Sequence, residues 1–133
     1  MGADLQRVLY LEDDPNIAEI AQMAMVDISG LNVLHCASGG AAIENYARFQ
    51  PDLLLFEVML PDMDGVETLH AIREAHGSST PVIFMTAKAQ THEQQKYMDE
   101  GALSVIVKPF DAFHLGDQLK SLWSARAPLK MGA

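Results

Sequence analysis

Short apolar runs alternate along this chain with longer segments in which apolar residues recur at helical spacing. The last three runs are continuously apolar after their first residue, as is typical of strands that helices cover on both faces. Repeated strand–helix units of this kind predict an α/β fold built on a doubly wound, five-stranded parallel sheet. The strands are expected at residues 7–11, 31–36, 52–56, 81–85 and 104–107.

Candidate capping residues mark where the helices between these strands begin. Pro15 suits a first helical turn, and Asp14 before it can accept hydrogen bonds from the free amides of that turn. Candidate caps of the next three helices are, in chain order, Ser38, Asp64 and Thr91, and a last helix is expected from Asp111. The middle three are expected to run to Phe49, to residue 75 before Gly77, and to Gly101.

Apolar positions at helical spacing identify the inward faces of the first and last helices. For the first helix these positions are Ile17, Ile20, Ala21 and Ala24. For the last helix they are Phe113, Leu115, Leu119 and Leu122. Because this pattern decays after Trp123, we predict one domain over residues 1–126 and a flexible C-terminal tail over residues 127–133.

Composition narrows the classes of function. A chain of 133 residues that is 49% hydrophobic has room for one domain with a proper core. Its net charge of -9 would repel a nucleic-acid backbone, so direct DNA or RNA binding is not expected. No apolar run approaches the roughly 18 residues that span a bilayer, and a lone Cys36 cannot form an internal disulfide. We therefore expect a cytoplasmic protein with no membrane segment.

Polar residues follow four of the five expected strands. In an open parallel sheet the carboxyl ends of the strands share one edge, where ligands collect at the point at which strand order reverses. The residues at these ends are Glu12, Asp13 and Asp14, then Glu57, then Thr86 and Ala87, and finally Lys108 and Pro109. Carboxylates, a hydroxyl and an ammonium group are thus expected to converge on one rim.

Three carboxylates on one rim repel one another, and a divalent cation is a natural counter-charge. Oxygen ligands without a nearby histidine favour Mg²⁺ or Mn²⁺ over zinc, and such a site suits phosphoryl chemistry. Each residue also has a plainer interpretation when taken alone. The triplet at 12–14 can simply cap a helix, Thr86 can stabilise a turn, and Lys108 can be an exposed lysine at a strand end. Their joint placement favours the functional interpretation.

The segments LYLEDDP, PDLLLFEVMLPDMDG, PVIFMTAKA and GALSVIVKPF carry a family resemblance. In order and spacing they resemble the receiver domain of two-component response regulators, a flavodoxin-like (βα)5 fold, over about Arg7 to Leu122. The resemblance implies that Mg²⁺ is held by Glu12, Asp13, the residue at 57 and the backbone carbonyl of Met59. It further implies a switch hydroxyl on Thr86 beside Ala87, a phosphoryl-binding Lys108, and a cis bond before Pro109.

Two positions depart from the family pattern. Glu57 stands where receivers have the aspartate that accepts a phosphoryl group, and its extra methylene moves the carboxylate out of line for transfer. We expect phosphorylation to be weakened or lost and Mg²⁺ binding to be weakened, with Glu57 either imitating the phosphorylated state or simply pairing with Lys108. Val105 replaces the usual aromatic reporter of activation, and valine has few rotamers with which to report.

We therefore expect a signalling module that is not an enzyme. The expected partners are a histidine kinase or phosphotransfer protein and a downstream effector, with the face of the fourth helix, fifth strand and fifth helix open to docking or homodimerisation. The chain can be a stand-alone receiver or part of a longer regulator. An Mg²⁺-dependent phosphatase is a weaker alternative, because Pro15 stands where the second aspartate of its Asp-x-Asp motif is needed. An FMN-binding flavodoxin is another, although the acidic triplet at 12–14 would repel the phosphate of FMN.

Overall fold

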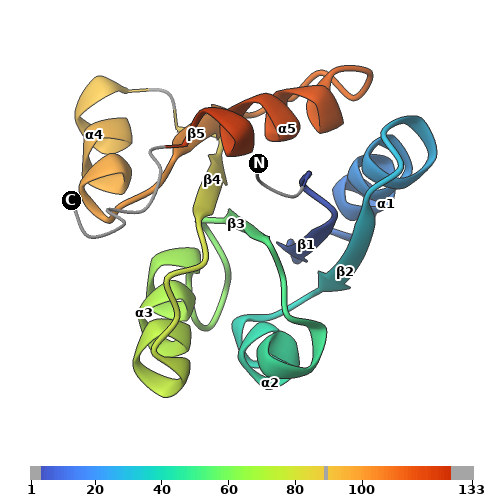
Figure 1. Cartoon of the computed structure of the whole chain (residues 1–133). Helices are drawn as coiled ribbons and strands as arrows, with labels where there is room; N and C mark the ends of the chain where they lie inside the picture. The colour runs from blue at the N-terminus through green and yellow to red at the C-terminus, as the bar shows by residue number, and fades with distance from the viewer. Residues whose placement is uncertain (1–3, 89, 127–133) are drawn as a thin grey trace.

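A five-stranded parallel sheet forms the centre of the molecule (Figure 1). The computed structural model describes residues 4–88 and 90–126. The strand order is β2-β1-β3-β4-β5, so the chain moves outward in both directions from β1, and the expected doubly wound α/β fold is confirmed. The strands are β1 (Arg7–Leu11), β2 (Asn32–Cys36), β3 (Leu53–Glu57), β4 (Val82–Thr86) and β5 (Ser104–Val107).

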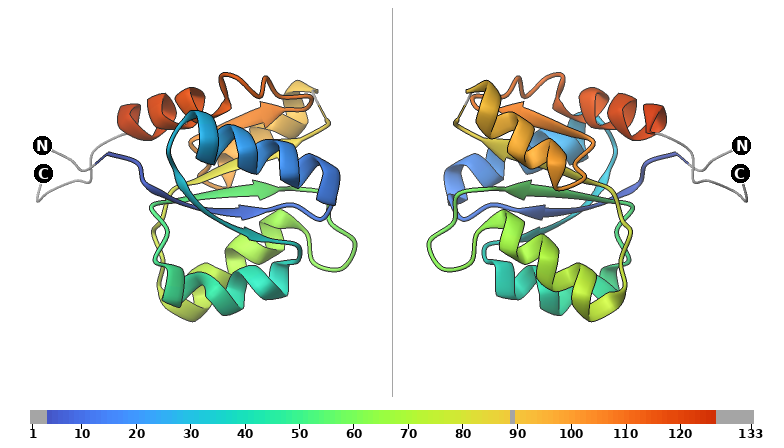
Figure 2. Two further views of the ribbon diagram at one scale, coloured as in Figure 1. Left: turned by 90° about the vertical axis from the view of Figure 1, so that its right-hand side faces the viewer. Right: turned by 90° about the vertical axis from the view of Figure 1, so that its left-hand side faces the viewer.

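Helices cover both faces of this sheet. In the side views α1 and α5 lie over one face and α2 and α3 over the other (Figure 2). The helices are α1 (Pro15–Met23), α2 (Gly39–Phe49), α3 (Gly65–His76), α4 (Thr91–Asp99) and α5 (Leu115–Ala125), and a π-helical segment, η1 (Ala24–Ile28), continues α1. Two helical layers leave β3 and β4 buried along their whole length, which explains why these strands are continuously apolar.

The hydrophobic core is divided by the sheet into two clusters, because successive side chains of a strand point to opposite faces. Val8 and Tyr10 of β1 pack in the cluster under α1 and α5. Leu9 and Leu11 of the same strand pack in the cluster under α2, α3 and α4. Every second residue along a strand therefore faces the same helical layer, and this alternation decides which side chains can meet where the strands end.

Local capping chemistry sets most of the helix starts as expected. Asp14 accepts hydrogen bonds from the amides of Asn16 and Ile17, with Pro15 in the first turn of α1. Ser38 accepts a hydrogen bond from an amide of α2, and Asp64 forms a capping box with Glu67 at the start of α3. The left-handed Gly77 ends α3, as its sequence position predicts.

Two helices begin differently from the prediction. Thr91 is the first residue of α4 rather than its cap; Gln90 holds the cap position and makes no side-chain capping bond. The last helix begins at Leu115 and not at Asp111, whose carboxylate instead accepts hydrogen bonds from Phe113 and His114 in a turn that precedes α5. A local bond to the backbone competes here with the helix.

The expected inward faces of α1 and α5 were partly wrong. Ala21 and Ala24 are buried, but Ile20 is 53% exposed; Leu115 and Leu119 are buried, but Phe113 in the turn before α5 is 75% exposed. The predicted tail, residues 127–133, lies outside the described residues.

Candidate functional site

Three side chains from separate strand ends meet at the carboxyl edge of the sheet. Glu12 follows β1, Glu57 is the last residue of β3, and Lys108 follows β5. Each continues a row of side chains on the face covered by α1 and α5, after Tyr10, Leu55 and Ile106 respectively, because residues two apart in a strand face the same side. The convergence expected from the sequence is therefore present for these three residues.

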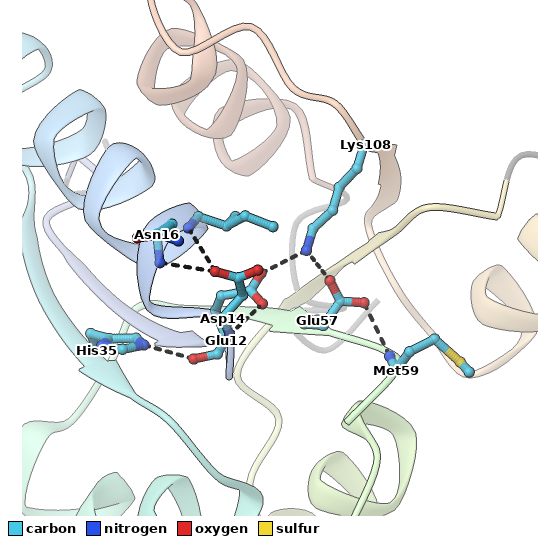
Figure 3. A network of polar contacts seen from close by, with 8 residues as sticks. Glu12, Asp14, Asn16, His35, Glu57, Met59 and Lys108 are labelled. Atoms are coloured by element: carbon cyan, nitrogen blue, oxygen red, sulfur yellow. Dashed lines mark hydrogen bonds and ion pairs between the residues drawn. The ribbon is translucent and has the colours of Figure 1, made fainter. Parts of the chain in front are cut away.

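The ammonium group of Lys108 lies between the two carboxylates (Figure 3). Lys108 Nζ donates a hydrogen bond to Glu12 Oε1 at 2.7 Å and forms an ion pair with Glu57 Oε1. The three side chains are largely removed from solvent, with exposed fractions of 2% for Glu12, 7% for Glu57 and 14% for Lys108. A buried pair of carboxylates needs such a cation, since the cost of removing each charge from water is recovered only through good partners.

Backbone amides bind the remaining carboxylate oxygens. Glu12 Oε2 accepts a hydrogen bond from the amide of Asp14 at 3.1 Å, and Glu57 Oε2 accepts one from the amide of Met59 at 3.0 Å. Each of the four oxygens of Glu12 and Glu57 thus has a donor. Charge-assisted hydrogen bonds of this kind fix the position of both carboxylates.

Burial and hydrogen bonding shift the pKa values of Glu12 and Lys108. Burial raises the pKa of Glu12, although the hydrogen bonds from Lys108 and from the amide of Asp14 oppose this shift. Burial lowers the pKa of Lys108, but the hydrogen bonds to Glu12 and Glu57 outweigh burial, so the pKa is raised overall. At neutral pH Lys108 is therefore an ammonium group whose charge is committed to these two partners.

His35 on β2 was not expected at this site. Its Nε2 lies 2.8 Å from the backbone carbonyl oxygen of Glu12, and its ring packs against Tyr10 with centroids 5.6 Å apart. No motif in the sequence marks His35. It reaches the site through the register of β1 and β2, in which His35 pairs with Tyr10, the residue two positions before Glu12. His35 thereby ties the acidic turn after β1 to the edge of the sheet.

The predicted switch residues make none of the contacts that connect Glu12, Glu57 and Lys108 in the described part of the chain. Thr86 is fully buried and follows Val82 and Phe84, which face α2, α3 and α4. Its hydroxyl accepts a hydrogen bond from the amide of Lys88 at 3.1 Å. Ala87 is exposed in the following loop, and Val105 packs as a half-buried residue on the same face as Phe84. The bond between Lys108 and Pro109 is cis, as expected.

The fit of a divalent cation can be tested on these contacts. Within residues 4–88 and 90–126, no group of three acidic, histidine or cysteine side chains is placed to hold a metal ion. Asp13 follows the row of Leu9 and Leu11 and is exposed. An ammonium group about 4 Å from a divalent ion repels it by about 8 kcal/mol at an effective dielectric near 20. As arranged, Glu12, Glu57 and Lys108 do not fit Mg²⁺ between the two carboxylates.

Gly65 allows the close packing that holds the end of β3. Its amide donates to the carbonyl oxygen of Val58, and a Cβ added to Gly65 would lie 2.2 Å from the carbonyl oxygen of Glu57. We expect Gly65→Ala to destabilise the protein by about 1–3 kcal/mol, because backbone would have to shift. Gly40→Ala is the matched control, since its Cβ would meet nothing closer than Ser38 Oγ at 4.0 Å. Urea unfolding of both variants measures the difference, and equal stabilities would contradict the packing argument.

Comparisons with known proteins agree with this architecture. Residues 8–120 match the family described as response regulator receiver domain. The transcriptional regulatory protein DltR of Streptococcus agalactiae is 39% identical over 82% of this chain and 48% of its own length. The regulatory protein AtoC of Escherichia coli is 33% identical over 80% of this chain and 23% of its own length. The chain therefore spans about half the length of these curated relatives, or less.

A solved structure has the same arrangement of strands and helices. The chemotaxis protein CheY4 of Vibrio cholerae is 25% identical, with a TM-score of 0.79 over 89% of this chain and 98% of that protein. None of the helices in the described part of the chain has the length and apolar character needed to cross a lipid bilayer.

Proposed function

Since the chain belongs to the response regulator receiver domain family of two-component signalling, we propose that it is an atypical receiver whose acceptor position is held by Glu57. In this proposal ordinary phosphorylation is weakened or lost, and signalling proceeds through protein contacts. Receiver domains are generally signalling modules and not enzymes, and they usually bind Mg²⁺ at the acceptor site.

The placement of the Glu57 carboxylate carries the proposal. Glu57 ends β3, where the family has its phosphorylated aspartate, and its two oxygens are bound by Lys108 and by the amide of Met59. A nucleophile for in-line transfer must lie within a fraction of an ångström of the correct position. A carboxylate that is one methylene longer, and is held there by Lys108 and by the amide of Met59, does not meet this condition.

The same contacts support a partial imitation of the phosphorylated state. The negative charge of Glu57 reaches Lys108, the residue that in receivers pairs with the phosphoryl oxygens. The imitation is incomplete, because a phosphoryl group brings more charge and three acceptor oxygens. The hydroxyl of Thr86, moreover, is bound by the amide of Lys88. We propose a fixed intermediate output and not a fully active one.

The proposed partners are a histidine kinase or phosphotransfer protein and a downstream effector. Relatives named as transcriptional regulatory proteins support an output in transcription. A net charge of -9 argues that contacts with protein, and not contacts of this chain with DNA, deliver it. Homodimerisation through α4, β5 and α5 stays a prediction, and a single buried Cys36 is compatible with the proposed cytoplasmic location.

Two other functions considered from the sequence gain no support from the site. A phosphatase of the aspartyl-phosphate type needs a second aspartate two residues after the first, and Pro15 occupies that place at the start of α1. An FMN phosphate at the end of β1 would meet the carboxylate of Glu12, and the amide of Asp14 already donates to that carboxylate.

Incubation with acetyl phosphate and Mg²⁺, followed by intact mass, tests the proposal. We expect no stable gain of a phosphoryl group by the wild-type chain over times that label an ordinary receiver measured in parallel. A gain that maps to Glu57 would contradict the proposal, because it would mean that the bound, longer carboxylate still acts as acceptor.

A further inference from the structure

Lys108 occupies the place at which a cation must lie to neutralise the acidic pair. Its Nζ contacts one oxygen of Glu12 and one of Glu57, and these are the oxygens that face each other across the site. The outer oxygens are bound by the amides of Asp14 and Met59. Mg²⁺ takes about six oxygen ligands near 2.1 Å, several of them usually water, and an ion between the two carboxylates would compete with Lys108 Nζ for the oxygens that Lys108 contacts.

We propose that the ammonium group of Lys108 stands in for the divalent cation of this site, so that the wild-type chain holds Glu12 and Glu57 together without a metal and binds Mg²⁺ weakly. This inference rests on the proposed function, because it concerns the same acceptor position.

The length of the Glu57 side chain allows the ammonium group of Lys108 to take the place of a divalent ion. The carboxylate lies one methylene farther from β3 than that of an aspartate, which brings Oε1 into contact with Lys108 Nζ while Oε2 still reaches the amide of Met59. On the same backbone the carboxylate of a shorter side chain would lie closer to β3 and farther from Lys108 Nζ. Lys108 would then compete less strongly with a divalent ion for that carboxylate.

The other surroundings of Lys108 offer the ammonium group no second partner. The cavity of about 490 Å³ beside Lys108 is open to solvent and is lined otherwise by side chains without a charge, those of Ile17, Ile20, Ala87, Pro109 and Phe110. An ammonium group displaced by a metal would exchange two carboxylates for a setting that offers no carboxylate in return. Metal binding must therefore overcome the loss of both ion pairs as well as its own dehydration.

Counting free Mn²⁺ by electron paramagnetic resonance, without any phosphodonor, tests the inference. The proteins compared are the wild type, Lys108→Met, Glu57→Asp and Lys96→Met, the last removing an exposed ammonium group of α4. We expect Lys108→Met and Glu57→Asp to bind Mn²⁺ at least about tenfold more tightly than the wild type, because the competing charge is removed or withdrawn. Lys96→Met should match the wild type.

Broadening of the amide signals of Asp13 and Met59 by Mn²⁺ identifies binding at this site and separates it from binding elsewhere on an acidic surface. A wild-type affinity within twofold of either site variant would overturn the inference. If Lys108→Met fails to fold without metal, Mn²⁺ should restore its folding. The inference would also be overturned if Mn²⁺ did not restore that folding and Glu57→Asp bound Mn²⁺ no more tightly than the wild type. Tight metal binding by an unlabelled wild type would remove this inference and leave the proposed function intact, whereas labelling by acetyl phosphate would remove the proposed function.

Discussion

Glu57→Asp is expected to raise the initial rate of labelling by acetyl phosphate by roughly 100-fold, since a misplacement of about 1 Å at a reacting atom costs about that factor. The shorter carboxylate withdraws from Lys108, which frees an oxygen for attack and leaves Lys108 to pair with the incoming phosphoryl group. Intact mass over a time course in Mg²⁺ measures the rate. Peptide mapping then places the phosphoryl group on residue 57.

A matched variant shows whether the effect belongs to the site. Glu74→Asp removes one methylene from an exposed glutamate of α3 and should label no faster than the wild type. If Glu57→Asp also stays unlabelled, the barrier lies elsewhere. Two candidates then remain. One is Val105, and the other is the loop after Thr86, in which the amide of Lys88 donates a hydrogen bond to the Thr86 hydroxyl. Val105→Tyr in the Glu57→Asp background is the variant that separates these two causes.

Lys108→Met is expected to lower the free energy of unfolding by about 3–5 kcal/mol at pH 7, because it leaves two buried carboxylates without a cation. Methionine replaces the apolar stem of the lysine as far as Cε and lacks only the ammonium group, so the expected loss is mainly electrostatic. Urea unfolding in the absence of divalent ions measures the difference. Lys96→Met, on the exposed face of α4, should change stability by less than about 0.5 kcal/mol.

The pH dependence of this difference identifies its cause. Burial raises the pKa of Glu12 already in the wild type, and removing Lys108 removes the hydrogen bond that opposes the shift. A carboxyl group with a raised pKa in the folded state costs stability above that pKa, and the cost disappears as pH falls toward the usual glutamate value of about 4.3. The deficit of Lys108→Met should therefore shrink from pH 7 toward pH 5. A deficit that is constant over this range would contradict an electrostatic origin.

At alkaline pH it is the wild type that loses stability, because Lys108 gives up its proton. The hydrogen bonds to Glu12 and Glu57 outweigh burial and raise the pKa of Lys108 above its ordinary value of 10.5. A raised lysine pKa contributes stability that is fully present below the unfolded value and is lost as pH rises through the folded value. The difference between wild type and Lys108→Met should accordingly narrow again above about pH 10.5.

Sequence periodicity alone determined the architecture. The five apolar runs lie within one residue of the observed strands. The reason is clearest for β3 and β4, because strands that are buried on both faces must be continuously apolar.

The predicted caps were confirmed at Asp14, Ser38 and Asp64, where a side-chain oxygen accepts a hydrogen bond from an amide of the first helical turn. The predictions at Thr91 and Asp111 were wrong: Thr91 is the first residue of α4 and not its cap, and the last helix does not begin at Asp111. The Asp111 carboxylate bonds Phe113 and His114 in a turn before α5, a local arrangement that competes with the helix.

Exposure along the helices could not be predicted from spacing alone. Ile20 and Phe113 have the spacing of buried residues, but they are 53% and 75% exposed. Helical spacing defines the direction of a side chain, whereas its burial depends on how far the neighbouring element extends over it. The turn at 111–114 and the π-helical segment after α1 change that coverage, and neither was predicted.

For the site, the sequence determined which groups share an edge, and the tertiary structure decided which of them touch. Parallel strands bring Glu12, Glu57 and Lys108 to one rim whatever their separation in the chain, so their convergence follows from strand order alone. Alternation along β4 then places Thr86 in the row of Val82 and Phe84, on the other face of the sheet, and Asp13 is exposed. Only the folded arrangement places the ammonium group of Lys108 between the two carboxylates, because a contact between residues 96 positions apart depends on the reach of each side chain from its own strand.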